Sequence, residues 1–378
     1  MNSGLIPTRA AIAVADMLDN CIQIQRDQHV LLLCALDGLY GGKNLIDEEA
    51  ITWIQNAIQL RGAHATVMWI DMPLHPDVYW SRTSNDIPAW DFSKLVKGAM
   101  AGADLVINNL TDYWTEGELR DRVPNYFYNM ATTSRLLSST WALTPWELVA
   151  EIRVRASAMV STGAKWRITH PNGTDVSGTV ADQLMPRYWE SRRGPWPEGV
   201  FPSTASVGAE GEMVFNANGP HWARHIGVPL RFTEPVRMTL QDGKIKEIRG
   251  GAEADIYRDF LKALSHHLGE DAAYSMRGFH GGAHPQGIVS EQECPDVYYR
   301  AFIEHHGAHS VHFHISNAHE AANYPFNIHI SAEVNGATVQ VGDNIIYKDG
   351  RMTAFDHPEV QKIAAKYPNR PGLEPGLW

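Results

Sequence analysis

The chain has 378 residues, 44% of them hydrophobic and 20% charged, which predicts a globular protein with two or three domains. Its net charge of −11 argues against nucleic acid or an anionic membrane as the main partner. The three cysteines form no CxxC pair, and no leader or membrane-spanning apolar run is evident, so we expect a cytoplasmic protein without a cysteine-based zinc site.

Strand and helix patterns alternate through the first 160 residues. The segment H-V-L-L-L-C-A-L at 29–36 is a nearly continuous aliphatic run, which is typical of a strand covered on both faces. A helix at 45–61, a strand at 64–70, a helix at 92–101 and a strand at 104–110 follow. This alternation predicts an α/β domain with a parallel sheet, which we assign to residues 1–162.

The second half is rich in hairpin signals. Strand-like segments flank the dipeptides Asn172-Gly173, Asp242-Gly243, Asn335-Gly336 and Asp349-Gly350, which are the strongest short-range indicators of hairpins. One helix is expected at 253–268. We therefore predict an α+β domain rich in antiparallel hairpins over residues 163–378, and we expect it to carry the active site.

Two segments near the C-terminus place histidines at alternating positions. In V-H-F-H-I, residues 311–315, apolar side chains alternate with His312 and His314. In I-H-I-S-A-E-V, residues 328–334, they alternate with His329, a serine and Glu333. Because successive side chains of a strand point to opposite faces, neighbouring strands with matching faces would gather these imidazoles into a metal or proton-transfer site. The alternative is a row of solvent-facing histidines.

Three motifs of the second half resemble one known family. They are N-G-T-D at 172–175, G-E-M-V-F at 211–215 followed by P-V-R-M-T-L-Q-D-G-K-I at 235–245, and H-I-S followed later by G-D-N-I-I-Y-K-D-G. Together they are similar to the family of aminopeptidase T, which also contains 2,5-dihydroxypyridine 5,6-dioxygenase. The resemblance covers roughly residues 165–355, and the N-terminal half agrees in architecture only. It implies an aminopeptidase T-like fold and a homo-oligomer.

The resemblance also implies a metal site, with departures. Glu212 and His329 match ligands of the family, whereas Ser331 stands at a ligand aspartate and Met276 at a ligand glutamate or histidine. A hydroxyl and a thioether are poor ligands for Fe(II) or Zn(II). Either the site is rebuilt as a mononuclear centre of histidines with or without a glutamate, or the metal is lost and the histidines act as acids and bases. His280 or His284 could replace Met276.

The resulting assignment names two overlapping groups of residues. The expected ligands of a divalent metal, with Fe(II) favoured over Zn(II), are His329, His312, Glu212 and His280. The expected catalytic residues are Glu212, His312, His314 and Ser331. The pairs His305-His306 and His266-His267 end predicted helices, and we expect them to complement the helix dipoles rather than bind anything.

The expected substrate is a small aromatic acid. The sequence has 12 Trp and 13 Tyr, with several in a Pro-rich segment, and these suit a flat ligand. Arg192, Arg193 and Arg224 could clamp a carboxylate, and His284 could cap the site. We predict metal-assisted, dioxygenase-like ring opening of a hydroxylated aromatic or N-heteroaromatic acid. The alternatives are aminopeptidase-like or amide hydrolysis, including a metal-free His/Glu mechanism, and a non-catalytic small-molecule binder.

Overall fold

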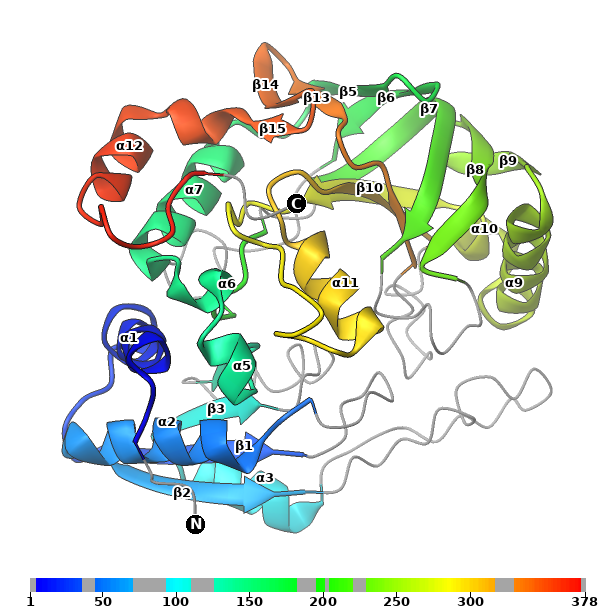
Figure 1. The fold of residues 1–378 in the computed structure, drawn as a ribbon. Helices are drawn as coiled ribbons and strands as arrows, with labels where there is room; N and C mark the ends of the chain where they lie inside the picture. The colour runs from blue at the N-terminus through cyan, green and yellow to red at the C-terminus, as the bar shows by residue number, and fades with distance from the viewer. Residues whose placement is uncertain are drawn as a thin grey trace.

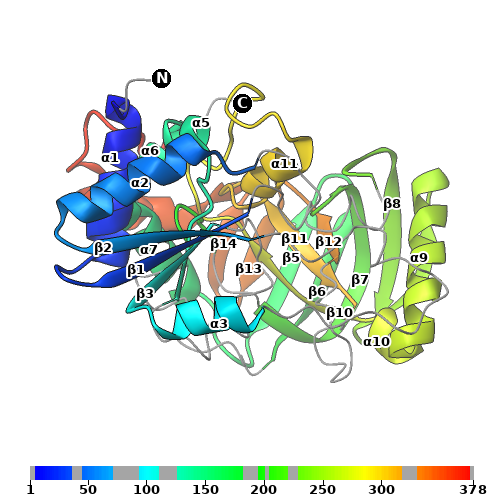
Figure 2. The ribbon, with the colours of Figure 1, turned by 90° about the horizontal axis from the view of Figure 1, so that it is seen from below.

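The computed structural model describes residues 5–35, 45–70, 93–109, 126–181, 195–200, 204–219, 229–316 and 330–374. Within them the chain forms a four-stranded sheet and an eleven-stranded sheet, which lie side by side with helix α11 (Val297–His305) between them (Figures 1 and 2). The predicted combination of a parallel α/β layer and a hairpin-rich α+β part is confirmed.

The small sheet is entirely parallel, with the strand order β2-β1-β3-β4. Its strands are β1 (His29–Cys34), β2 (His64–Trp69), β3 (Leu105–Asn109) and β4 (Tyr126–Tyr128). Helices α1 (Thr8–Asp16) and α2 (Glu48–Leu60), with the π-helical segment η1 (Met17–Ile22), cover one face, and α3 (Lys94–Ala101) covers the other (Figure 2).

The aliphatic run of β1 explains this layering. Val30 and Leu32 belong to the core beneath α1 and α2, whereas Leu31 and Leu33 pack with α3 on the opposite face. All four side chains are at most 3% exposed. A strand in the middle of such a sheet needs apolar residues at consecutive positions, because both of its faces are covered.

Asp47 joins two helices at the edge of this layer. Its Oδ1 accepts a hydrogen bond from Ala50 N at 2.6 Å and thereby caps α2. Its Oδ2 accepts from Ser134 N at 2.7 Å and from Ser134 Oγ at 2.9 Å, at the start of α5 (Ser134–Leu137). One carboxylate therefore satisfies backbone donors of both helices, which would otherwise lack partners within the helix.

Replacing this carboxylate should destabilise the fold. We expect Asp47→Ala to lower the free energy of unfolding by about 1–2 kcal/mol, because helix α2 loses its cap and Ser134 loses its acceptor. Urea denaturation followed by circular dichroism measures the change. Gln59→Ala, at an exposed position of the same helix, serves as the control. Equal midpoints for the two variants would contradict the capping role.

The large sheet is antiparallel at every described pairing. Its strands are β5 (Lys165–His170), β6 (Thr174–Val180), β7 (Thr204–Asn218), β8 (Arg231–Gln241), β9 (Lys244–Arg249), β10 (Met276–Gly281), β11 (Val311–Ile315), β12 (Ile330–Glu333), β13 (Thr338–Val341), β14 (Asn344–Lys348) and β15 (Arg351–Met352). The 15-residue strand β7 organises them, because it pairs with β6 and β8 and also meets β10 and β12. Helices α9 (Ala252–Leu268) and α10 (Glu270–Ala273) complete this part of the molecule.

Three of the four predicted hairpins are present. The turns at Asn172-Gly173, Asp242-Gly243 and Asp349-Gly350 join paired strands. The prediction at Asn335-Gly336 is wrong, because β12 pairs with β11 and β7, whereas β13 pairs with β5 and β14. The dipeptide does form a turn, with a φ of 87° at Gly336. A turn signal specifies a local reversal of the chain, but longer-range pairing decides which strands become neighbours.

Two helices connect the two halves of the molecule. In α7 (Trp146–Ala158), Leu148 and Ile152 pack in the core of the large sheet, and Val149 packs in the core of the small sheet. Helix α11 packs Tyr299 and Phe302 into the small-sheet core, although it belongs by sequence to the second half. The domain boundary at residue 162 stays a prediction.

The remaining helices lie along the chain before α7 and after β15. They are α6 (Thr140–Leu143), the 3-10 segment η3 (Thr353–Asp356) and α12 (Pro358–Ala364). None of the helices in the described part of the chain is long and apolar enough to cross a bilayer.

Candidate metal centre

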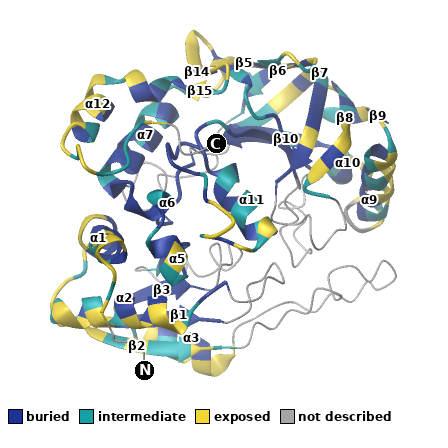
Figure 3. Cartoon of the chain, viewed as in Figure 1, coloured by how far each residue is buried: buried dark blue, intermediate teal, exposed yellow. Residues whose placement is uncertain are grey.

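Three adjacent strands bring polar side chains into one row. In the register of β10, β11 and β12, His280 lies opposite His312, which lies opposite Glu333. The next row consists of Phe279, Phe313 and Ala332, all at 0% exposure in the large-sheet core. Because side chains alternate along a strand, this part of the sheet has one apolar face and one His-bearing face. Figure 3 shows β10 as a mostly buried strand.

The histidine cluster is formed by His280, His305 and His312. Each offers a ring nitrogen, and the three nitrogens lie within 4.8 Å of one another. The rings of His305 and His312 stack with centroids 3.7 Å apart, and His280 meets His312 edge-on at 4.1 Å. Their exposures are 7%, 2% and 0%, in order of residue number, so bulk water has little access to these nitrogens.

The sequence predicts that His305 only complements the dipole of its helix, and the structure corrects this prediction. His305 does end α11, and His306 follows as the C-cap. However, the packing of Tyr299 and Phe302 in the small-sheet core turns the last residue of the helix toward β11. This placement depends on contacts between segments that are distant in sequence. No local pattern around His305 could have revealed it.

Glu333 lies beside His305. Its Oε1 is 2.8 Å from His305 Nδ1, and its Oε2 is 4.0 Å from Arg231 Nη1. Arg231 Nη2 in turn donates to both carboxylate oxygens of Glu304, at 3.0 and 2.9 Å. A hydrogen bond from His309 lowers the pKa of Glu304, and Arg231 adds to this effect against the opposing influence of burial. A chain of charged side chains therefore leads from the surface to His305.

His314 and Ser331 lie two residues along the strands from His312 and Glu333, in the adjacent row that faces the same side of the sheet. They are cross-strand neighbours on the His-bearing face. The ring of His314 is 4.6 Å from that of His280 and 5.2 Å from that of His312. Ser331 is 1% exposed, and its Oγ makes no hydrogen bond within the part of the chain that the structure describes. The structure thus brings both predicted residues to the edge of the cluster.

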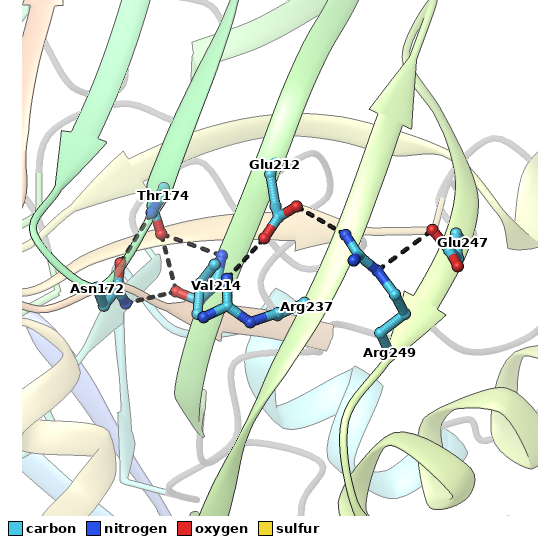
Figure 4. Close-up of polar contacts among 7 residues, drawn as sticks. All are labelled: Asn172, Thr174, Glu212, Val214, Arg237, Glu247 and Arg249. Atoms are coloured by element: carbon cyan, nitrogen blue, oxygen red, sulfur yellow. Dashed lines mark hydrogen bonds and ion pairs between the residues drawn. The ribbon is translucent and has the colours of Figure 1, made fainter.

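The structure does not bring Glu212 into this group. Figure 4 shows its carboxylate between two guanidinium groups. Arg237 Nη1 donates to it at 2.7 Å and Arg249 Nη2 at 2.8 Å. Glu212 lies on the stretch of β7 that pairs with β6 and β8, whereas β7 meets β10 and β12 only near its two ends. Its position on the sheet therefore separates it from the histidines.

The surroundings of His284 suit a structural role better than a role in capping the site. It is fully buried, and its Nδ1 accepts a hydrogen bond from Gln286 N at 3.0 Å within the same loop. Burial lowers its pKa to about 3. Met276, which the resemblance aligns with a ligand, lies in the large-sheet core. The other predicted ligand and substrate residues, His329, Arg192, Arg193 and Arg224, lie outside the described residues.

The buried neutral imidazole of His284 should make stability depend on pH. The pKa of His284 is lower in the folded state than in the unfolded state. Its contribution to the free energy of unfolding is therefore fully present above pH 6.5, the pKa in the unfolded state, and is lost as the pH falls below that value. In the His284→Asn variant, the amide oxygen can replace Nδ1 as the acceptor, and the side chain does not titrate. On lowering the pH from 7 to 5, we expect the free energy of unfolding to fall by about 2 kcal/mol more in wild type than in this variant. Urea denaturation at both pH values measures this. Parallel losses in the two proteins would contradict the assignment.

A buried pair of side chains, His306 and Glu198, lies next to the cluster. His306 Nε2 is 3.4 Å from Glu198 Oε1, and both side chains are almost fully buried. Burial and the neighbouring His305 hold the pKa of His306 well below its usual value. Arg153, on α7, donates from Nε to Val200 O at 3.1 Å. These contacts fix the residue that directly follows His305 against the segment containing Glu198.

The donor set of the cluster fits a divalent transition-metal ion. Imidazole suits zinc, iron and copper, and each metal–nitrogen bond measures about 2.1 Å, so two ligand nitrogens of one ion lie at most about 4 Å apart. The three nitrogens, which lie within 4.8 Å of one another, are near this limit. His305 also has a carboxylate beside its Nδ1, which leaves Nε2 for a metal ion, and many metal-binding histidines contact a carboxylate in this way.

The fold and this cluster define a protein with a parallel α/β layer and a large antiparallel sheet, with three buried histidines on and against the large sheet. The sequence matches the family of 2,5-dihydroxypyridine 5,6-dioxygenase over residues 20–354, and the chain belongs to that family. No curated protein matches the sequence.

Solved structures with a similar fold include the following two. The 2,5-dihydroxypyridine dioxygenase from Pseudomonas putida superposes with a TM-score of 0.65 at 16% identity, covering 94% of this chain and 99% of that one. Wild-type AmpT from Thermus thermophilus gives a TM-score of 0.50 at 12% identity, covering 91% and 99%. At these identities the likeness establishes the fold alone, and it confirms the expected aminopeptidase T-like fold.

Proposed function

We propose that this protein is an enzyme that opens the ring of a small hydroxylated aromatic or N-heteroaromatic acid by a dioxygenase-type reaction. Family membership over most of the chain supports the reaction class. The observation that carries the proposal is the buried cluster of His280, His305 and His312 on and against the large sheet. A rigid sheet holds two of these imidazoles, and precise positioning of ligands is a requirement of metal catalysis.

In this proposal the three histidines hold one divalent metal, with Fe(II) favoured over Zn(II). The reaction of dioxygen with an aromatic ring requires electron transfer. A redox-active ion such as Fe(II) would supply it, whereas zinc has no redox chemistry. The donors are neutral, so they do not compensate the charge of a dication. An anionic substrate that binds through adjacent oxygens or a carboxylate therefore suits this centre.

The chain's own residues would bind and orient the substrate. His314 lies beside the cluster, and its imidazole can accept a proton from a ring hydroxyl. Ser331, its cross-strand neighbour, can donate a hydrogen bond to a substrate oxygen. Arg192, Arg193 and Arg224 remain our candidates for binding the substrate carboxylate. A cytoplasmic location and a homo-oligomer likewise remain proposals.

Hydrolysis has less support. The likeness to AmpT concerns the fold, and hydrolysis by two metal ions relies on carboxylates that bridge and neutralise them. Within the described residues, the cluster contains no carboxylate ligand, since Glu333 faces Nδ1 of His305 and Glu212 faces two arginines. No specific observation favours a non-catalytic binder.

Oxygen consumption tests the proposed reaction. We expect the Fe(II)-loaded protein to take up one O2 per ring opened with 2,5-dihydroxypyridine or a related hydroxylated pyridine or benzoic acid. An oxygen electrode and the loss of aromatic absorbance measure the two quantities. His312→Ala should lower kcat/KM on the order of 100-fold or more, because the metal is lost. His266→Ala, at an exposed helix end, is the matched control. Metal-loaded protein that consumes no O2 with any of these compounds would refute the proposal.

The metal content of two variants tests whether the histidine cluster or Glu212 binds the metal. We expect His280→Ala to lose most of its bound metal, whereas Glu212→Gln keeps a wild-type amount, because Glu212 is occupied by Arg237 and Arg249. Elemental analysis of untagged protein after dialysis gives the metal-to-protein ratio. The opposite result would restore Glu212 as a ligand and remove His280.

A further inference from the structure

We infer that Glu333 is a positioning residue that fixes His305 as the third metal ligand, with Arg231 supporting Glu333 from the protein surface. This inference rests on the metal site of the proposed function. It concerns the way in which a helix residue is added to a site otherwise built on strands.

The first step is the tautomer of His305. Its Nδ1 is 2.8 Å from Glu333 Oε1, and an ionised carboxylate can only accept a hydrogen bond. We therefore assign the proton to Nδ1 of His305, which then donates it to Glu333. In a neutral ring the other nitrogen, Nε2, then holds the lone pair, and a metal ion binds only a nitrogen with a lone pair. The contact with Glu333 thus determines which nitrogen of His305 can serve as a ligand.

The second step is the support of Glu333 itself. Its side chain is 6% exposed, and it lies directly opposite His312 across the β11–β12 pair. A carboxylate buried to this degree needs partners, because the loss of water around its charge is costly. His305 faces one of its oxygens, and the guanidinium of Arg231 lies 4.0 Å from the other. Glu304 in turn holds Arg231 in place.

The third step is the position of helix α11. Its apolar side packs in the small-sheet core through Tyr299 and Phe302, so the backbone of His305 is placed without any contribution from the metal. What remains to be set is the rotation of the imidazole ring. The stacking on His312 and the hydrogen bond to Glu333 set it together. Removing the charge of Glu333 should therefore affect metal affinity more than it affects folding.

The experiment measures Co(II) binding to the metal-free full-length protein. The dissociation constant is obtained by competition with a chelator, and the visible absorption of Co(II) reports its ligands. We expect Glu333→Gln to weaken binding roughly 10- to 100-fold and to shift the absorption band. An amide accepts a hydrogen bond more weakly than a carboxylate and can also donate one, which favours the wrong tautomer.

A double-mutant cycle with His305→Ala tests whether Glu333 acts through His305. Once His305 is absent, Glu333→Gln should cause no further loss of affinity. Additive losses would overturn the inference, because they would show that Glu333 acts on the metal directly or through the fold in general. Thermal unfolding of each metal-free variant distinguishes a local effect from loss of structure.

Surface variants keep the test decisive if Glu333→Gln fails to fold. We expect Arg231→Gln to weaken Co(II) binding by roughly 2- to 5-fold and Arg231→Lys to restore it, since a cation again faces Glu333. Glu247→Gln is the control, because Glu247 also pairs with an arginine, Arg249 at 3.2 Å, on the outer face of the same sheet. Equal affinity for wild type and Arg231→Gln, with Glu333→Gln unfolded, would overturn the inference.

The outcomes also separate this inference from the proposed function. Wild-type protein that binds one Co(II) in the expected manner but, with Fe(II), opens no ring refutes the reaction and leaves the role of Glu333 standing. Wild-type protein that opens rings, but whose Co(II) affinity and spectrum are unchanged in a folded Glu333→Gln variant, does the reverse. Wild-type protein that binds no Co(II) overturns both.

Discussion

The register of β10, β11 and β12 is the constraint on which the candidate site depends. It places His280, His312 and Glu333 in one row and the Phe279–Phe313 pair in the next. A shift of one residue in β10 or β11 would put imidazoles into the hydrophobic core and phenyl rings onto the polar face. The apolar core therefore fixes the register, and the register in turn places the histidines. Stability of the sheet and geometry of the site have a single cause.

This constraint supplies only part of the cluster. The third histidine comes from α11, whose position depends on the core of the other sheet. The site is thus assembled where the two halves of the molecule meet, with α11 anchored in one and His305 directed at the other (Figure 1). Such an arrangement makes the cluster sensitive to the relative placement of the two sheets. A binding site between two structural units is a frequent arrangement in enzymes.

The sequence revealed what is encoded locally. The continuous apolar run of β1 predicted a doubly covered sheet, and the alternation in β11 predicted a strand with two histidines on one face. It could not reveal His305, because the reason for its position lies in contacts of Tyr299 with residues far away in the chain. The hairpin expected at Asn335-Gly336 failed for the same reason. Local signals predicted elements and turns, and tertiary pairing decided their neighbours.

The positions of the carboxylates bear most directly on the chemistry of the site. Glu212, which the sequence suggested as a ligand, is satisfied by two arginines, whereas Glu333 faces Nδ1 of His305. In the described residues, negative charge near the cluster therefore acts through an imidazole instead of on the metal. Neutral donors leave the positive charge of a dication for the substrate to balance. A hydroxylated acid, which can present two anionic oxygens, balances it better than a neutral peptide amide does, and this difference favours ring opening over peptide hydrolysis.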